Sequence, residues 1–573
     1  MKILLLHTDY IKFKALKKAL KSIGELSEKE KEEHLVKEAL VVLTAVEKRD
    51  SDTKKIVEKL VESIADVVKQ VKAERVVLYP YAHLSSDLAS PEQAIEVLNE
   101  AEKELKKKFD VVKAPFGYYK EFEFKVKGHP LSELSRELIV EDGKAVVKEE
   151  EFTDEMRKKL LNKISTVKLD TSRLKENDHR IIGQQMGLFM FHDTAPGMPY
   201  WLPAGLTIYN ELINFWREEH KKRGYQEIVS PLMNKKELYK ISGHWDHYKE
   251  NMFIAHTDED EDYCLKPMNC PNAMLVFKMQ PRSYKELPLR LSDTDRLHRF
   301  ERSGTLNGLL RVRGFQQDDS HNFITEDMIK SEYEAIFEIC EKFYSIFNLK
   351  YSFRLGTRPE SFLGEKKTWD KAETALKEVL EKSGKKFTIL ERDGAFYGPK
   401  VDILMKDSQG REWQMGTMQL DFQLPQRFEL KYTDKDGKEK TPVVIHRVIY
   451  GSLERFMGVL IEHLNGRFPT WLAPVQVKIL NFTDRNTDYA KKIFNELQKE
   501  IPNLRVECDF RQTTVPSKVK DAEIMRVPYI IVIGDKEEKE KKLAVRVKGS
   551  NKIEIIGMKE FVEKIKKEIQ ERI

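Results

Sequence analysis

The stretch RLHRFERSGTLNGLLRVRGFQQDDSH, residues 296–321, concentrates charge of both signs between short apolar runs. Five arginines are followed by two glutamines, two aspartates and a histidine. Arg299 and Glu301 alternate across Phe300, so on a strand they would share one face. A guanidinium binds phosphate through paired, charge-assisted hydrogen bonds, and a neighbouring carboxylate can fix its direction. We therefore expect a strand that binds an anion; the alternative is an ordinary solvated strand.

The composition of the flanking segments, from about residue 178 to residue 474, is typical of a large core rich in antiparallel strands. An amphipathic helix over 206–223 precedes a strand that stops at Ser230 and Pro231, because proline lacks the amide donor of a central strand. A later strand, PVVIH, leads into a helix with Arg455 in its first turns. The chain contains neither GxxxxGK[ST] nor GxGxxG, so arginines would have to hold the phosphates of any nucleotide.

Outside this core the chain alternates strands and helices. The pattern predicts a multidomain α/β and α+β protein with an α/β unit over 1–140, a charge-rich helical linker over 141–178, a core domain over 179–472 and a second α/β domain over 473–573. The helix expected over 54–72 carries its apolar residues on one face.

Composition excludes some classes of protein. The chain has 100 Lys and Arg against 95 Asp and Glu, and a net charge of +5 does not by itself indicate nucleic-acid binding. Four cysteines in 573 residues do not make a disulfide scaffold, so we expect a reduced, cytoplasmic protein. No stretch approaches 18 apolar residues, so no membrane span is expected.

Three of these segments resemble motifs 1, 2 and 3 of the class II aminoacyl-tRNA synthetases. More narrowly, residues from about 178 to 573 resemble the threonyl-tRNA synthetase family in GHWDHYKENMF, LKPMNCPN, RVRGFQQDDSH, GAFYGPKVDI, WQMGTMQLDFQLPQRF and PTWLAPVQV. The resemblance implies a class II catalytic core built on an antiparallel sheet, an α/β anticodon-binding domain, and a homodimer joined through 206–231. It also implies that threonine, ATP and tRNA(Thr) are the substrates.

Residue roles carried over from the family are expectations at this stage. Arg299 would hold the ATP α-phosphate and Arg455 the γ-phosphate, with Mg²⁺ bridging the phosphates. His244 would lie near the 2′-hydroxyl of the terminal adenosine, and Lys400 is expected among the catalytic residues. The residues expected to line the threonine and ATP site are Glu301, Arg311, Gln317, Asp319, Tyr397, Gln414 and Gln419.

A zinc site is the family's further implication. Local spacing would favour His244, His247 and the nearby cysteines, whereas the resemblance implies one Zn²⁺ per subunit on Cys270, His321 and His446. Pro271 predicts a helix that begins near Cys270, and a helix N-terminus favours thiolate. Three ligands leave a position open for threonine's amine and hydroxyl, which excludes valine. Serine lacks only a methyl, worth about 1–3 kcal/mol, and would be misactivated.

Residues 1–140 resemble the archaeal-type editing domain of threonyl-tRNA synthetases, which shares its fold with D-aminoacyl-tRNA deacylases. The matching pieces are HTDY, YPYAHLSSDLASP and APFGYYKEFEFKVKGHPLSELSR. The resemblance implies hydrolysis of seryl-tRNA in a pocket containing His83, Tyr119, Lys120 and Glu133. The alternative is an inactive domain that only docks RNA. The bacterial editing domain with its HxxxH motif is missing, so the chain combines a bacterial-like core with an archaeal-like first domain.

Two other functions remain open: a sister class IIa synthetase for proline, serine, glycine or histidine, and a non-catalytic RNA-binding paralogue. The proposed zinc ligands disfavour the first, and the intact arginines disfavour the second. In the C-terminal domain the candidates for RNA contact are Arg511, Lys518, Lys520 and Arg526. A solvated helix face is the alternative for at least half of them.

Overall fold

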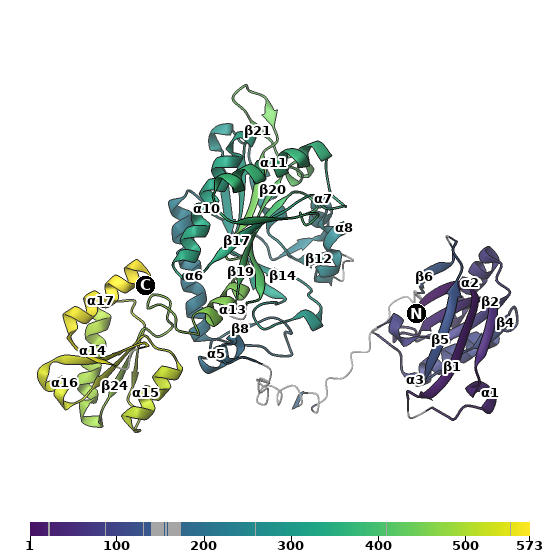
Figure 1. Cartoon of the computed structure of the whole chain (residues 1–573), viewed down its shortest axis with the longest axis horizontal. Helices are drawn as coiled ribbons and strands as arrows, with labels where there is room; N and C mark the ends of the chain where they lie inside the picture. The colour runs from purple at the N-terminus through teal and green to yellow at the C-terminus, as the bar shows by residue number, and fades with distance from the viewer. Residues whose placement is uncertain are drawn as a thin grey trace. The chain divides into compact units, whose positions relative to one another are not determined.

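The structure is a computed structural model that describes residues 1–20, 23–85, 87–129, 131–138, 154, 157–158, 174–257, 259, 261–407, 410–549 and 552–573. The chain divides into two compact units, Met1–Phe152 and Thr153–Ile573. Figure 1 shows the elements of each unit. Most of the linker predicted over 141–178 lies outside the described residues. Within the described ranges, no helix is long and apolar enough to cross a membrane.

The first unit is built on one six-stranded sheet. Its strand order is β4-β3-β2-β1-β5, with β6 also paired to β1. The β2–β3 and β3–β4 pairs are parallel, whereas β1 pairs antiparallel with β2, β5 and β6. The elements are β1 (Lys2–Lys18), α1 (Glu28–Lys31), β2 (His34–Ala45), α2 (Thr53–Val71), β3 (Arg75–Pro80), α3 (Pro91–Leu105), β4 (Asp110–Lys113), β5 (Tyr118–Val126) and β6 (Glu133–Glu137).

The second unit is organised around an eight-stranded sheet in the order β18-β17-β19-β20-β23-β16-β13-β9. Five of its pairs are antiparallel, and the outermost pairs, β17–β18 and β13–β9, are parallel. The predicted antiparallel-rich core is thus confirmed. The strands of this sheet are β9 (Gln226–Glu227), β13 (Leu289–Asp293), β16 (Asp319–Ile324), β17 (Tyr351–Gly356), β18 (Phe387–Leu390), β19 (Lys400–Lys406), β20 (Glu412–Asp421) and β23 (Val443–Val448).

Helices and short strands complete this core. The helices are α5 (His179–Gln185), α6 (Pro203–Lys222), α7 (Lys236–Ser242), α8 (His244–Tyr248), α9 (Cys270–Lys278), α10 (Ile329–Ser345), α11 (Lys366–Lys382), α12 (Leu424–Arg427) and α13 (Leu453–His463). The short strands are β7 (Phe189–Met190), β8 (Tyr200–Trp201), β10 (Met233–Lys235), β11 (Ile254–His256), β12 (Asp262–Leu265), β14 (Arg296–His298), β15 (Gly314–Gln316), β21 (Tyr432–Thr433) and β22 (Glu439–Lys440).

The two faces of the large sheet are covered differently. One face packs against α6, α10, α11 and α13 in the main apolar core, to which β16 contributes Ile324 and β23 contributes Ile445. On the other face Phe323 and Val444 join a smaller cluster with α9. Because successive side chains of a strand point to opposite faces, His321 and His446 share the face of this smaller cluster. The candidate site lies on that second face.

A glycine turn positions the helix of Arg455. Gly451 follows β23 with a φ of +77°, and a Cβ there would lie 1.8 Å from the main-chain oxygen of Met415. Only glycine permits this close approach. The next residue, Ser452, caps α13 by accepting a hydrogen bond from the Arg455 amide at 3.2 Å. The Gly-Ser pair therefore directs α13, and Arg455 in its first turn, toward the sheet.

The C-terminal domain contains a separate five-stranded sheet in the order β25-β24-β26-β27-β28. The first two pairs are parallel and the last two antiparallel. Its elements are β24 (Val477–Asn481), α14 (Thr487–Glu500), β25 (Val506–Asp509), α15 (Val515–Ile524), β26 (Tyr529–Ile533), α16 (Asp535–Glu540), β27 (Lys542–Val547), β28 (Ile553–Gly557) and α17 (Met558–Glu571). The predicted α/β character of this domain is confirmed.

Candidate metal and nucleotide site

Strand register places three polar side chains in a row across the sheet. His446 on β23 lies opposite His321 on β16 and, on its other side, opposite Gln419 on β20. Cys270 reaches the same place from the first turn of α9, which begins at that residue, with Pro271 just inside the helix. The sequence prediction of a helix starting at this cysteine is confirmed. These residues are distant along the chain, and they meet for two reasons. The strand register places His321 and His446 side by side, and α9 begins where Cys270 can reach them.

Cys270, His321 and His446 form a buried cluster whose ligand atoms all lie within 4.8 Å of one another. His446 Nε2 lies 2.8 Å from Asp421 Oδ2, which leaves Nδ1 for a metal. His321 Nδ1 is buried and has no hydrogen-bond partner in the described part of the chain. A metal ion would satisfy this nitrogen, and a carboxylate behind a ligating histidine is a common support for zinc. The residues present therefore fit a divalent metal with a preference for nitrogen and sulfur.

Protonation of the cluster departs from the sequence expectation in one respect. Burial, reinforced by Asp319 and Asp421, raises the pKa of the Cys270 thiol well above its ordinary value. The helix N-terminus alone does not make it a thiolate, so the expectation drawn from Pro271 was incomplete. Burial also lowers the pKa of His321, which keeps its ring neutral as a metal ligand requires. Binding of a cation would release the thiol proton.

Arginines gather at the other end of the same cavity. Arg455 Nε donates to the main-chain oxygen of Leu310 at 2.9 Å, and its Nη1 donates to that of Gln414 at 2.7 Å. Arg299 Nε donates to Pro267 O at 3.0 Å. Burial, with Arg299 and Arg311 nearby, lowers the pKa of Arg455 to about 10, so the group stays cationic at neutral pH. Main-chain oxygens thus hold the guanidinium groups in place before any anion binds.

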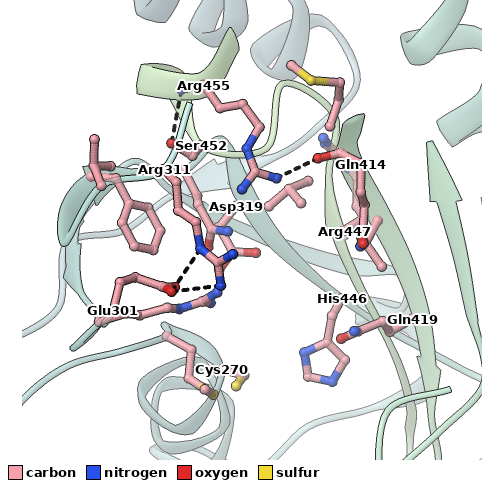
Figure 2. Close-up of a pocket in the computed structure, with 18 of the residues that line it drawn as sticks. Cys270, Glu301, Arg311, Asp319, Gln414, Gln419, His446, Arg447, Ser452 and Arg455 are labelled. Carbon is pink, nitrogen blue, oxygen red and sulfur yellow. Dashed lines mark hydrogen bonds and ion pairs between the residues drawn. The ribbon is translucent and has the colours of Figure 1, made fainter. Parts of the chain in front are cut away.

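The cavity between these ends has a volume of about 350 Å³. Figure 2 shows Arg455, Arg311 and Glu301 on one side and Cys270, His446 and Gln419 on the other. The sequence-predicted residues that line it are Cys270, Arg299, Glu301, Arg311, Gln317, Asp319, Tyr397, Gln414, Gln419, His446 and Arg455. Near the cluster, Asn269 donates to Asp319 at 3.1 Å, and burial raises the pKa of Asp319. The site can therefore receive a ligand that is anionic at one end and coordinates metal at the other.

The strand predicted for residues 299–301 is wrong. β14 ends at His298, and Glu301 N donates to Arg299 O at 2.9 Å in a turn-like segment that a strand does not make. Both side chains still line the cavity. Arg311, rather than Arg299, forms the ion pair with Glu301, at 3.0 Å. The alternation in sequence therefore identified Arg299 and Glu301 as site residues. It did not predict the main-chain geometry that brings both side chains to the cavity.

Three predicted residues of the core domain do not line the cavity: His321 of the metal cluster, His244 and Lys400. His244 is buried behind it, with Nδ1 2.8 Å from Ser242 Oγ and its ring 6.2 Å from that of Tyr397. Burial lowers the pKa of His244 to about 3, so its imidazole is neutral. Lys400 Nζ forms ion pairs with Asp393 at 3.1 Å and Asp402 at 3.2 Å. A direct role for Lys400 would need this side chain to leave its carboxylates. His247, which local spacing would favour as a zinc ligand, is exposed and stacks on Phe396.

The first unit has its own cavity of about 480 Å³. His83, Tyr119 and Lys120 line it together with Tyr79, Tyr81 and other aromatic side chains. Lys120 Nζ donates to Pro115 O at 2.8 Å and to Tyr118 O at 3.2 Å, and lies 5.1 Å from the centre of the Tyr79 ring. Burial lowers the pKa of Lys120 to about 8. An amine that titrates near neutral pH is suited to acid–base work in a pocket.

Glu133 is placed elsewhere. It begins β6, where it lies opposite Leu6 of β1, and it does not line the cavity of His83, Tyr119 and Lys120. The sequence alone did not predict that β6 pairs with β1. Its inclusion in the editing pocket therefore stays a prediction.

Comparison with known proteins identifies both units. Residues 1–138 match the archaea-specific editing domain of threonyl-tRNA synthetase, residues 248–464 the class II tRNA synthetase core domain (G, H, P, S and T), and residues 474–568 an anticodon-binding domain. A crystal structure of the RNA-binding domain of threonyl-tRNA synthetase from Cryptosporidium parvum superposes with a TM-score of 0.66 and 39% identity, covering 68% of this chain and 98% of that one. The chain belongs to the threonyl-tRNA synthetase family.

Curated members of the threonyl-tRNA synthetase family extend the comparison. A threonine–tRNA ligase of Clostridium botulinum strain 657 is 50% identical over 396 residues, and that of Clostridium tetani is 48% identical over 399. These matches cover 69% and 70% of this chain and 62% of each relative, so the chain spans about 62% of the length of the curated relatives that it matches. The predicted resemblance to this family is confirmed, and with it the three-domain fold class.

In the anticodon-binding domain of this family member, three of the four predicted basic residues bind other groups of the protein. Lys518 is buried and donates to Asn481 Oδ1 at 2.5 Å. Arg511 is paired with Asp509 and Asp521. Arg526 Nε donates to Asn465 O at 2.8 Å in the segment after α13. Arg511 and Lys520 are exposed, whereas Lys518 is buried, so the alternative of a solvated helix face does not apply to Lys518.

Several site residues escaped sequence reasoning. Asp421 and Asn269 support the metal cluster and Asp319, and Thr417 lines the cavity beside Gln414. Asp402 is fully buried behind Gln414. All four lie within segments that resemble the family, but no local pattern marked them as site residues. The alternation of side chains along a strand could have found two of them. Thr417, Gln419 and Asp421 are two residues apart on β20, so their side chains share one face, and one at the site implies that the others are near it.

Proposed function

We propose that the chain is a threonine–tRNA ligase that activates threonine with ATP and transfers it to tRNA(Thr). The observation that carries the proposal is one cavity lined both by Cys270 and His446, which form a buried cluster with His321, and by Arg299, Arg311 and Arg455. Threonine's carboxylate attacks the α-phosphorus, which gives threonyl-adenylate and pyrophosphate. The arginines hold the phosphates and offset the charge that develops on them, with Mg²⁺ supplied by ATP.

The amino-acid end of the cavity supports selection of threonine. Cys270, His321 and His446 would hold one Zn²⁺. The metal, when bound, supplies a position for the amine and the β-hydroxyl. Asp319 lines the same cavity and accepts a hydrogen bond from Asn269, and it would bind the amine of threonine. Valine lacks the hydroxyl, and loss of a polar contact at a site built for it discriminates far more strongly than loss of a methyl.

The amino-acid specificity of ATP–pyrophosphate exchange tests the synthetic function. We expect exchange with threonine, weaker exchange with serine, and none above background with valine, proline, glycine or histidine. The expected serine disadvantage is about 10–200-fold, from a single missing methyl. A non-catalytic paralogue would show no exchange with any amino acid. Equal exchange with proline or glycine would indicate another class IIa specificity.

The first unit is proposed to hydrolyse seryl-tRNA formed by mistake. The match over 1–138 to the archaea-specific editing domain and the cavity around Lys120 support this role. The depressed pKa of Lys120 leaves part of the amine neutral slightly above neutral pH. Lys120 would act with His83 and Tyr119 on the ester of the bound RNA end. An inactive domain that only docks RNA is the competing function.

Replacement of Lys120 by Ala is expected to let seryl-tRNA accumulate while threonine activation stays normal. Positioned acid–base or electrostatic groups contribute about 10²–10⁴-fold, so deacylation of preformed seryl-tRNA should fall by at least about 100-fold. Lys127→Ala is the matched control, because this lysine directly follows β5 and is paired with Asp9 and Glu38. If a chain lacking residues 1–140 mischarges with serine no more than the intact chain, the editing proposal is wrong.

A homodimer is proposed from the family. The segment after α6 exposes apolar side chains at Val229, Leu232 and Met233. The strand of this segment, β9, ends at Glu227 and not at Ser230 as predicted. Exposed apolar groups gathered on one segment are typical of an interface. The mass of the chain in solution, measured by light scattering, tests this association.

A further inference from the structure

A buried carboxylate behind the cavity organises the side chains around it. Asp402 on β19 is fully buried, and its two oxygens accept from four side chains. Oδ2 accepts from Arg354 Nη2 at 2.9 Å and lies 3.2 Å from Lys400 Nζ. Oδ1 accepts from Gln414 Nε2 at 2.7 Å and from Thr417 Oγ1 at 3.1 Å. One oxygen thus faces two cations, and the other faces two neutral donors.

This arrangement fixes which end of the Gln414 amide faces the ligand. The Thr417 hydroxyl donates to Asp402, so its oxygen accepts the second amide hydrogen of Gln414, at 2.7 Å. Both hydrogens of the Gln414 side-chain amide are therefore engaged. Within the described residues, Oε1 of Gln414 makes no hydrogen bond, and the residue lines the cavity. A ligand meets an acceptor at this position.

Gln419 lies on the same strand and has the opposite polarity. Its Oε1 accepts from the Tyr397 hydroxyl, which burial keeps protonated by raising its pKa. Its amide nitrogen is left for a ligand. Gln419 lies opposite His446, whereas the main-chain oxygen of Gln414 accepts from Arg455, as Figure 2 shows. The cavity therefore offers an acceptor at its arginine end and a donor at its metal end.

We propose that Asp402 is a positioning residue that holds Gln414 as a hydrogen-bond acceptor for a donor group of the bound nucleotide. The inference rests on the proposed function, because it assumes that the arginine end receives ATP. The donors that ATP can offer are its two ribose hydroxyls and its exocyclic amine. Asp402 touches none of them and acts through Gln414.

Asp402→Asn is expected to reverse the Gln414 amide. The single oxygen of the introduced amide remains with Arg354 and Lys400, because an amide hydrogen cannot face two cations. The new NH₂ then faces Gln414 and Thr417, so Gln414 turns its own oxygen toward position 402 and presents NH₂ to the ligand. In Asp402→Asn/Gln414→Glu, the introduced amide donates to one oxygen of the introduced carboxylate, and the other oxygen restores an acceptor in the cavity. The double variant also conserves the total charge.

Calorimetric binding of ATP and three analogues to the full chain tests the proposal. The analogues lack the 2′-hydroxyl, the 3′-hydroxyl or the exocyclic amine. We expect the unsubstituted protein to bind one of them about tenfold more weakly than ATP, the effect of one lost hydrogen bond to an acceptor left unpaired. Asp402→Asn should bind ATP about tenfold more weakly and lose the discrimination, and the double variant should regain it. Asp370→Asn, which alters an exposed Asp–Arg pair of the same 2.9 Å length, should behave like the unsubstituted chain.

The ratio between ATP and analogue is the decisive quantity, because partial unfolding of a sample lowers both affinities equally. Unchanged discrimination in Asp402→Asn overturns the inference, as does a double variant that fails to discriminate. Equal binding of ATP and all three analogues by the unsubstituted chain also overturns it. If the unsubstituted chain binds no ATP, the proposed function itself fails, so the two failures are distinguishable.

Discussion

His321→Ala is expected to abolish stoichiometric zinc binding and to lower threonine-dependent ATP–pyrophosphate exchange by more than about 100-fold, since changes merely behind a metal ligand already reduce affinity or activity by about 10–100-fold. His321 lies between Leu291 and His446 on adjacent strands, so no neighbouring side chain on the described part of the sheet replaces its nitrogen. Zinc per chain is measured by atomic absorption alongside the exchange rate.

The matched control is His247→Ala, which removes an exposed histidine that stacks on Phe396. It should keep both zinc and exchange. Retention of one zinc per chain by His321→Ala would show that the ligand set is wrong. Loss of exchange with zinc retained would instead indicate that His321 contacts the substrate directly.

Arg455→Ala is expected to reduce exchange by about 10²–10³-fold, the usual effect of removing one fixed donor from a developing negative charge. Leu310 O and Gln414 O hold Nε and Nη1, which aims the remaining nitrogen into the cavity. Arg455→Lys should not recover the rate, because an ammonium lacks the planar fork that these two oxygens fix. The measurement is exchange at saturating threonine over a range of ATP concentrations.

A surface arginine serves as the control for this prediction. Arg485→Ala removes a guanidinium whose partner is the exposed Asp535 in the C-terminal domain, and exchange does not require RNA. Its rate should be unchanged. A rate for Arg455→Ala within about threefold of the unsubstituted chain, far short of the loss expected for a fixed donor, would contradict the role of this residue in phosphate binding.

Much of the fold followed from local pattern. The helix α2, predicted over 54–72, occupies Thr53–Val71, and the C-terminal domain has the predicted alternation of strands and helices. These elements have clear apolar periodicity, and each buries one face against a single sheet. The strand prediction for residues 299–301 was wrong because it rested on alternating charge alone. The main chain instead forms a turn-like hydrogen bond there, from Glu301 N to Arg299 O.

The candidate site was predictable as a set of residues but not as an arrangement. Lys400 was expected at the reaction and is held by Asp393 and Asp402, whereas Lys518 was expected near RNA and is buried on Asn481. Both outcomes depend on acidic or amide groups from other elements. A lysine's local sequence does not reveal which partner folding will bring to it.

By itself, the sequence determined the residue types and their order: arginines without a glycine-rich phosphate loop, a cysteine before proline, and a histidine at the end of a predicted core strand. The family resemblance implied that Cys270, His321 and His446 meet, and the structure brings them together. Tertiary structure alone decided that Arg311 rather than Arg299 pairs with Glu301, and that Gln414 presents its oxygen to the cavity. The physical reason is that periodicity selects the face of an element, whereas pairing register and burial select its neighbours.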